Sequence, residues 1–311
     1  MWFKGVHFPY PLMVAGGIVK TVDHAQRLIA ADTMFEWGSF TTDESLGNGG
    51  RDYYAAYTAH STHELDFTLN SIGLTNPGMK YAEKHGPELC VRARDKGHTF
   101  WINLSGVSVR DTVALIKRAI AAGFKIITVN GSCPNRPDHG GKGRAMPILC
   151  YDTDATSELF AALDKEIGPT EAIILWKISA GMPQPTLEHN IRLVATSQVM
   201  SGMVACNTVP NGFALLDDGK PAIQTNNGII RGGVGGPAIF PIVLGHVHSC
   251  ATMLHDSGKM VIGTGGVHSA ERIRAMRRAG AFITQTNSTF REANENPTII
   301  RDLLQDLIES A

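Results

Sequence analysis

One cysteine in this sequence stands among side chains that could hold a ligand for proton transfer. Cys133 follows Asn130 and Ser132 and precedes Asn135, so polar side chains surround the thiol. Buried polar groups need hydrogen-bonding partners, and a polar ligand would supply them. A thiol has a reference pKa of about 8.5, so a modest depression makes it a proton acceptor at neutral pH. A lone cysteine is more often an inert buried side chain, but these neighbours favour a catalytic base.

Polar side chains also interrupt other short apolar runs. Asn103, Lys177 and Asn207 each lie within or at the end of such a run, where an apolar core would need none of them. A lysine at the end of a buried strand costs free energy unless it meets a negative charge or extends to solvent. Together with Asn130, these residues predict a planar heteroaromatic ligand whose ring N–H and C=O groups are their partners.

Three glycine-rich turns are candidates for binding a phosphate. Their sequences are RGGVGGP at 231–237, GTGGV at 263–267 and QTNS at 285–288. Backbone N–H groups at the start of a helix bind phosphate, and glycine lets the backbone approach it closely. The candidate cofactor-binding residues are Gly235, Gly236, Thr264, Gly265, Gly266, Asn287 and Ser288. The pattern therefore predicts a phosphorylated, planar, hydrogen-bonding cofactor, and flavin mononucleotide (FMN) fits best.

Eight short apolar runs alternate with helical segments along the chain. The runs are mostly continuous, which is typical of parallel strands covered on both faces. The predicted strands are Leu12–Gly16, Met34–Ser39, Phe100–Gly106, Lys125–Ser132, Ala172–Ser179, Gly202–Thr208, Lys259–Gly265 and Ala281–Asn287. Eight strand–helix alternations in 311 residues predict an α/β fold of the (β/α)8 TIM-barrel type. A doubly wound sheet would need a second domain, and no linker-like stretch supports one.

Three long connections follow the second, fourth and sixth predicted strands. They are residues 40–79, 134–151 and 209–236, and all leave C-terminal strand ends, the face where barrel enzymes keep their active sites. Long structureless loops in a compact domain are usually lids or binding loops, although surface insertion is the simpler interpretation. We therefore expect residues 1–311 to form one FMN-binding domain with its site at this face.

Composition narrows the function classes. The net charge is −1, without a basic stripe, so neither nucleic acid nor an anionic membrane is an expected partner. Five cysteines without a CxxC pair, and twelve histidines without metal-ligand spacing, predict no disulfide framework and no metal. The sequence lacks a signal-peptide pattern and a run of about 18 apolar residues, so we expect a cytoplasmic protein that does not span a membrane.

Four motifs resemble the dihydroorotate dehydrogenase family. They are NSIGLTNPG at 70–78, NGSCPN at 130–135, GGVGGPAIFP at 232–241 and GTGG at 263–266, and they follow the family's order over nearly the whole chain. The cysteine of SCPN is similar to class 1, and the stretch 149–156 is similar to the fumarate-using homodimers of class 1A. The resemblance implies an FMN barrel that oxidises dihydroorotate to orotate in pyrimidine biosynthesis, with fumarate as acceptor and a homodimeric assembly.

The resemblance also implies a role for each motif residue. Cys133 would remove the C5 proton of dihydroorotate, and the C6 hydride would pass to the flavin. The substrate-binding residues would be Lys20, Asn70, Ile72, Gly73, Leu74, Asn130, Asn135, Asn207 and Thr208. The cofactor-binding residues would be Ala15, Gly16, Ser39, Asn103, Asn130, Lys177 and Asn207, together with those named above in the glycine-rich turns.

The sequence departs from the class 1 pattern at three places. Gly38 stands where class 1 enzymes carry a lysine at the end of strand two. Lys20 lies near the position of a class 2 lysine and either compensates or is an exposed lysine at a helix start. The loop 134–151 is longer than in similar class 1A chains, and Asn287 replaces the usual glycine of the last phosphate turn. These departures affect recognition of the substrate carboxylate more than flavin chemistry.

Other functions stay open at this point. The altered Gly38 region and the long loop would suit an FMN oxidoreductase of the same barrel that acts on another dihydropyrimidine or an unsaturated cyclic compound. A non-redox phosphate-binding barrel, such as an aldolase or isomerase, and a non-catalytic flavin-binding relative are further alternatives. The sequence does not fix the electron acceptor, and a second subunit with FAD and an iron–sulfur cluster stays possible.

Overall fold

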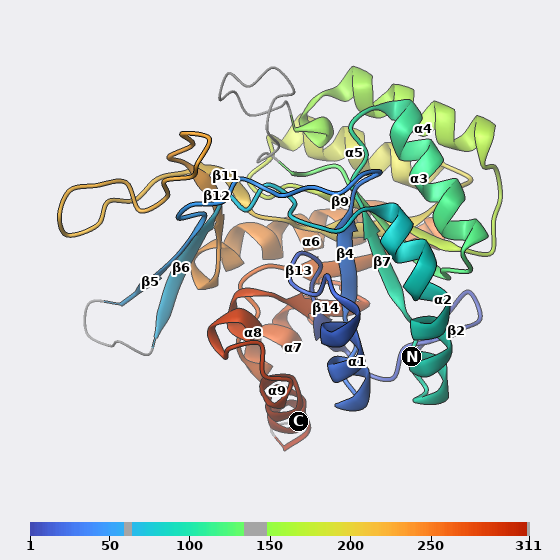
Figure 1. Ribbon diagram of the computed structural model, residues 1–311. Helices are drawn as coiled ribbons and strands as arrows, with labels where there is room; N and C mark the ends of the chain where they lie inside the picture. The colour runs from blue at the N-terminus through green and yellow to red at the C-terminus, as the bar shows by residue number, and fades with distance from the viewer. Residues whose placement is uncertain (59–63, 134–147, 310–311) are drawn as a thin grey trace.

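A parallel barrel forms the centre of the molecule (Figure 1). The computed structural model describes residues 1–58, 64–133 and 148–309. Eight parallel strands follow the order β3-β14-β13-β10-β9-β8-β7-β4, and a parallel bridge between Val14 and Phe35 joins the two ends of this sheet. The strands are β3 (Leu12–Val14), β4 (Glu36–Phe40), β7 (Trp101–Leu104), β8 (Ile126–Asn130), β9 (Ile173–Ile178), β10 (Met200–Ala205), β13 (Met260–Thr264) and β14 (Ile283–Thr286). The predicted (β/α)8 barrel is therefore confirmed.

Helices surround the barrel and pack against it through a large apolar core (Figure 1). They are α1 (Val22–Ala30), α2 (Met79–Asp95), α3 (Val109–Ala121), α4 (Thr153–Glu166), α5 (Gln184–Thr196), α6 (Phe240–Leu254), α7 (Ala270–Arg278), α8 (Ser288–Glu292) and α9 (Thr298–Glu309). The side chains of Thr21, Ser108 and Asp152 each accept a hydrogen bond from the backbone N–H three residues on. These N-caps explain why α1, α3 and α4 begin where they do.

Helix α6 is the most apolar of these helices. With the 3₁₀ turns η2 (Pro237–Ile239) and η3 (His255–Ser257) it spans 21 residues. Among the residues that the structure describes, it is the single helical stretch long and apolar enough to cross a bilayer, judged by length and composition. It packs along β13 and β10 and against α5, as an outer helix of the barrel does. The expectation that the protein does not span a membrane stays a prediction.

An antiparallel sheet, here called the arm, stands on the C-terminal face of the barrel (Figure 1). Its strands follow the order β11-β12-β6-β5, and their bounds are β5 (Tyr53–Tyr57), β6 (Leu65–Asn70), β11 (Val209–Gly212) and β12 (Gly232–Gly235). The connections 40–79 and 209–236 supply these strands, so the prediction that both are structureless was wrong. Their pairing is non-local, which local sequence patterns do not reveal.

The barrel interior changes in character along the strands. Toward their N-terminal ends it is filled by what we call the apolar layer, namely Phe8, Met13, Met34, Trp101, Ile126, Ile173, Leu175, Val204, Met260, Ile262 and Ile283. The N-terminal hairpin of β1 (Trp2–Phe3) and β2 (Val6–His7) leads into this layer. Toward the C-terminal ends lies the polar layer, which consists of the buried residues Glu36, Asn103, Thr128, Lys177 and Gln285. The polar layer is the base on which the site is built.

Candidate active site

A cavity opens at the C-terminal end of the barrel, between the strand ends and the arm. Nearly all of the residues that the sequence singled out line it: Cys133, Lys20, Asn70, Ile72, Gly73, Leu74, Asn130, Asn207, Thr208, Ala15, Gly16, Ser39, Lys177, Gly235, Gly236, Thr264, Gly265, Gly266, Asn287 and Ser288. Asn103 does not line the cavity. Asn135 lies outside the described residues, as do His139, Lys142 and Arg144 of the long loop. The structure thus brings the candidates together, while their roles stay predictions.

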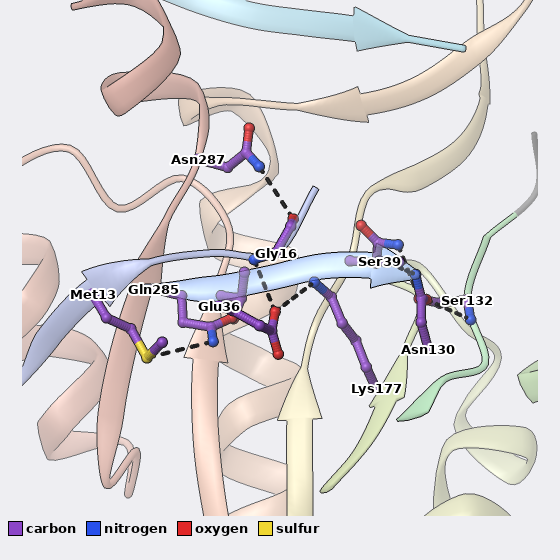
Figure 2. A network of polar contacts seen from close by, with 11 residues as sticks. Met13, Gly16, Glu36, Ser39, Asn130, Ser132, Lys177, Gln285 and Asn287 are labelled. Atoms are coloured by element: carbon purple, nitrogen blue, oxygen red, sulfur yellow. Dashed lines mark hydrogen bonds and ion pairs between the residues drawn. The ribbon is translucent and has the colours of Figure 1, made fainter. Parts of the chain in front are cut away.

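A chain of hydrogen bonds fixes the segment that leads to Cys133 (Figure 2). Asn130, the last residue of β8, donates its side-chain N–H to Ser39 Oγ over 3.2 Å. Its Oδ1 accepts from the backbone N–H of Ser132 at 3.1 Å and from the hydroxyl of Ser132 at 2.8 Å. Asn207 donates to Ser132 Oγ from the opposite side at 2.9 Å. Side chains from three strand ends therefore hold the backbone just before the thiol.

Lys177 meets a negative charge that the sequence analysis did not identify. Its Nζ lies 3.9 Å from Glu36 Oε2, and the two side chains are 3% and 0% exposed. The same Glu36 oxygen accepts a hydrogen bond from Gly16 N at 2.8 Å (Figure 2). The alternative of a lysine that extends to solvent is therefore wrong. The sequence does contain a signal for this ion pair. Glu36 interrupts the apolar run of Met34, Phe35 and Trp37, where an unpaired charge would cost free energy.

Asn103 lies one layer deeper than predicted. Its Cα pairs with Thr128 on the neighbouring strand, two residues before Asn130, so its side chain belongs to the polar layer. Unlike Lys177 of the same layer, it does not line the cavity. It is fully buried, and neither atom of its amide group has a hydrogen-bond partner among the described residues. The prediction that Asn103 faces the same cavity as Asn130 was therefore wrong, because Asn103 lies just below that cavity.

The missing class 1 lysine has a structural explanation at Gly38. This residue has φ +117°, and a Cβ atom there would lie 2.5 Å from the backbone oxygen of Asn103. No side chain fits at such a distance, so a cation on this side of the cavity would have to come from another element. Lys20 lines the cavity and donates through Nζ to the backbone oxygen of Thr75 at 2.5 Å. The alternative of an exposed lysine at a helix start is therefore wrong.

The electrostatic surroundings of Lys20 link it to the candidate base. Burial lowers the pKa of Lys20 to about 8, although a Cys133 thiolate opposes that shift and Arg291 adds to it. Lys20 is thus placed to carry a positive charge in the cavity at neutral pH.

The glycine-rich turns converge at the start of α6. Gly236, Gly265 and Gly266 have φ values of +81°, +126° and +68°, which favour glycine. A Cβ atom on Gly266 would lie 3.1 Å from the backbone oxygen of Gly236, and one on Gly235 would lie 3.5 Å from Ser288 Oγ. Turns from three separate segments therefore meet at one end of the cavity, as a shared phosphate site requires.

Tyr53 and Arg291 are among the cavity-lining residues that the sequence patterns did not reveal. Arg291 on α8 places its guanidinium 4.0 Å from the centre of the Tyr53 ring on β5. The Tyr53 hydroxyl donates to Glu292 Oε1 at 2.7 Å, and burial followed by this bond raises the pKa of Tyr53. Local sequence patterns predicted neither β5 nor α8, so this contact could not be expected from the sequence. The cluster ties the arm to the end of the last barrel strand.

The cysteines and possible metal ligands complete the description of the site. All five cysteines are free, with Cys133 half-buried and Cys150, Cys206 and Cys250 buried. Within the described ranges, no group of three or more histidine, cysteine, aspartate or glutamate side chains is arranged to hold a metal ion.

Comparison with known proteins places this barrel in a family. Fold and site together define an α/β-barrel protein whose cavity is lined by a thiol and by several glycine-rich turns. A family model described as dihydroorotate dehydrogenase matches residues 1–310, so the chain belongs to the dihydroorotate dehydrogenase family. The resemblance predicted from the four motifs is thereby confirmed.

Individual relatives agree over nearly the whole chain. A Streptococcus agalactiae serotype Ia protein described as "Putative dihydroorotate dehydrogenase A (fumarate)" is 30% identical, over 98% of this chain and 91% of its own length. The dihydroorotate dehydrogenase (fumarate) of Trypanosoma cruzi is 25% identical, over 97% of this chain and 90% of its own length. Both descriptions name a fumarate-linked enzyme, the class that the stretch 149–156 resembles.

Proposed function

We propose that this protein oxidises dihydroorotate to orotate with bound FMN, and that Cys133 is the catalytic base. The observation that carries the proposal is the shared cavity, where Cys133, Lys177 and the three glycine-rich turns meet. Membership of the dihydroorotate dehydrogenase family supports the reaction. Relatives described as fumarate-linked enzymes support fumarate as the electron acceptor and a place in pyrimidine biosynthesis.

The residues of the cavity fit a flavin nucleotide. Gly265 has φ +126°, and a Cβ atom there would lie 2.9 Å from Val243 Cγ2, so this turn favours glycine. Its backbone would then be free of side-chain bulk and could approach a phosphate. Lys177 lines the cavity from below and would hold the pyrimidine edge of the flavin, where a cation favours the reduced anion. Ala15, Gly16 and Ser39 would support the ring. Bound FMN would supply the two-electron acceptor that amino-acid side chains lack.

The remaining polar residues suit a small anionic pyrimidine. The amides of Asn70, Asn130 and Asn207 and the hydroxyl of Thr208 line the cavity and would bind the ring N–H and C=O groups. Lys20 would bind the carboxylate that distinguishes dihydroorotate from uncharged dihydropyrimidines. Cys133 would take the proton from C5, and positioned general-base catalysis of this kind is typically worth about 10²–10⁴-fold.

Anaerobic mixing with dihydroorotate tests the proposal. The purified protein should carry flavin, dihydroorotate should bleach the absorbance of the oxidised flavin, and fumarate should restore it. The Cys133→Ser variant is the matched control, because it should keep the flavin and bind orotate but bleach far more slowly at neutral pH. A colourless preparation without flavin would favour the non-redox barrel enzymes, and unchanged turnover in the variant would show that Cys133 is not the base.

A second candidate function follows from the structure around Gly38. Because no lysine fits there, the contacts to a substrate carboxylate differ from the class 1 pattern, and another dihydropyrimidine or an unsaturated cyclic compound could be the substrate. Orotate titration separates the two functions, since it should perturb the flavin spectrum only if orotate binds.

We also propose one domain, a cytoplasmic location and a homodimer. Sedimentation analysis of the purified protein tests the homodimer.

A further inference from the structure

A buried carboxylate lies beneath the cavity, and the reaction proposed above does not use it. Glu36 on β4 is 0% exposed, and its Oε2 lies 3.9 Å from Lys177 Nζ. Lys177 and Gly16 line the cavity, whereas Glu36 does not. Figure 2 shows the carboxylate between these two residues. The ammonium group of Lys177 therefore lies on the cavity side of this ion pair, and the carboxylate of Glu36 lies on the side away from the cavity.

The surroundings of Glu36 do not satisfy it completely. Its second oxygen, Oε1, has no hydrogen-bond partner among the described residues, and neither do the amide atoms of Asn103 or the hydroxyl of Thr128. Replacing a buried ion pair by apolar side chains is often neutral or stabilising. Stability alone therefore gives no reason for a carboxylate at this position, and an incompletely satisfied buried charge calls for a functional explanation.

The geometry of the ion pair suits a tuning role. At 3.9 Å the two charged groups attract each other strongly in the barrel interior, but the distance exceeds that of a hydrogen bond. Glu36 therefore compensates the charge of Lys177 without taking up its N–H donors. Oε2 also accepts the hydrogen bond from Gly16 N, so the carboxylate is fixed relative to the loop that follows β3.

We propose that Glu36 is a positioning residue that sets the reduction potential of the bound flavin by partly compensating the charge of Lys177. The inference rests on the proposed function, because it requires FMN in the cavity. A cation beside the pyrimidine edge favours the negatively charged reduced flavin, and a carboxylate behind that cation weakens the effect. This balance keeps the cofactor able both to accept electrons from the substrate and to pass them to the acceptor.

The Glu36→Gln variant removes the charge while keeping the shape and an oxygen that can accept from Gly16 N. The midpoint potential of the bound flavin should become more positive. We expect the equilibrium between reduced and oxidised flavin to shift about 10-fold toward the reduced form, equivalent to about 30 mV for a two-electron couple. Sulfite, which forms an anionic adduct with oxidised flavin, should bind about 10-fold more tightly. Reduction by dihydroorotate should become faster and reoxidation by fumarate slower.

Two further variants separate the charge from its surroundings. Thr128→Val changes a neutral residue of the same polar layer, whose hydroxyl also lacks a partner, so it should leave the potential and the sulfite affinity unchanged. In a Lys177→Met background, Glu36 has no cation to compensate. The effect of Glu36→Gln should then disappear.

The outcomes distinguish this inference from the proposed function. If the wild-type flavin is reduced by dihydroorotate but Glu36→Gln leaves its potential unchanged, only the inference is overturned. An equal shift in the Lys177→Met background would show that Glu36 acts directly on the flavin and not through Lys177. If Glu36→Gln does not retain flavin, Glu36→Asp, which keeps the charge but withdraws it, should give a smaller shift of the same sign. A wild-type protein without flavin overturns both proposals.

Discussion

The apolar layer and the polar layer of the barrel are built from the same strands, yet they contribute differently to stability and to the site. On β7, Trp101 and Asn103 are two residues apart and point to the same side, and both are fully buried. Trp101 packs its large ring edge-on against Phe8, and only its Nε1 lacks a hydrogen-bond partner among the described residues, whereas both polar atoms of the Asn103 amide lack one. One step along a strand thus separates a mainly apolar ring that packs in the core from a small polar amide directly below the cavity.

The difference shows where this molecule accepts a cost in stability. The apolar layer contains hydrophobic side chains only, and burial of such groups favours folding. Directly below the cavity, the polar layer contains an ion pair and several polar atoms that have no hydrogen-bond partner among the described residues. Substitutions in the apolar layer should therefore lower the free energy of unfolding and leave the reaction rate unchanged. Substitutions at the cavity end of the barrel should lower the reaction rate and change stability little.

Cys133→Ala should give the largest effect and leave the barrel intact. Loss of the base should lower kcat for dihydroorotate oxidation by about 10²–10⁴-fold at neutral pH. The thiol is half-buried and lies outside both layers, so the thermal midpoint should change little. Stopped-flow reduction of the flavin measures the first quantity, and calorimetry measures the second. A large loss of stability would contradict the division of roles.

Trp101→Ala should produce the opposite pattern. Truncation of a fully buried tryptophan in the apolar layer should lower the free energy of unfolding by about 3–5 kcal/mol. The flavin of the folded fraction should keep its spectrum and its response to orotate. Urea unfolding followed by circular dichroism gives the value. Trp2→Ala is the matched control, because Trp2 is 70% exposed and its loss should change the unfolding free energy little.

Gly38→Lys, which restores the residue of the class 1 pattern, should impair the protein. The new Cβ would lie 2.5 Å from Asn103 O, at a φ of +117°, so strain should destabilise the fold by about 1–3 kcal/mol. The control is Gly97→Lys, which has φ +78° but no neighbour within 4 Å and should show only the backbone strain. Thermal unfolding of both variants checks this. Tighter binding of dihydroorotate with normal stability would refute it.

Lys20→Met should weaken substrate binding without loss of fold. The KM for dihydroorotate should rise about 10-fold, since a hydrogen bond to a charged group contributes about 1.5–3 kcal/mol. The pKa of Lys20, lowered to about 8, predicts that the free wild-type enzyme loses this cation as the pH rises through about 8. The wild-type KM should therefore increase above that pH, and the KM of the variant should not. Steady-state kinetics between neutral and alkaline pH measure both.

Local patterns predicted the barrel but not the arm. Continuous apolar runs identified the parallel strands, and side-chain caps such as Ser108 marked helix starts, because both signals lie within a few neighbouring residues. The arm depends on Asn70, which pairs with Tyr53 on one side and with Gly233 on the other. Such pairing is decided by contacts between distant parts of the chain, so the connections were predicted as irregular.

The site shows the same limit. Motifs located Cys133 and the glycine-rich turns, because their residues are adjacent in the sequence. Glu36 was missed because its meaning depends on Lys177, which a separate strand supplies. Asn103 was placed too high because an apolar run does not reveal how far its strand is shifted against the next one. Depth within a barrel is a property of strand register, which the sequence expresses only indirectly.

The junction between β3 and β4 has one further consequence. The segments around these strands share one bridge, at Val14 and Phe35, and backbone hydrogen bonds from the N–H groups of Val14, Gly17 and Gly38. By contrast, β9 and β10 pair over five residues. Local opening of a protein begins where the fewest interactions must break. This short junction also carries Gly16, in the loop after β3, and Glu36 on β4. Local opening there would expose the polar layer of the barrel to water.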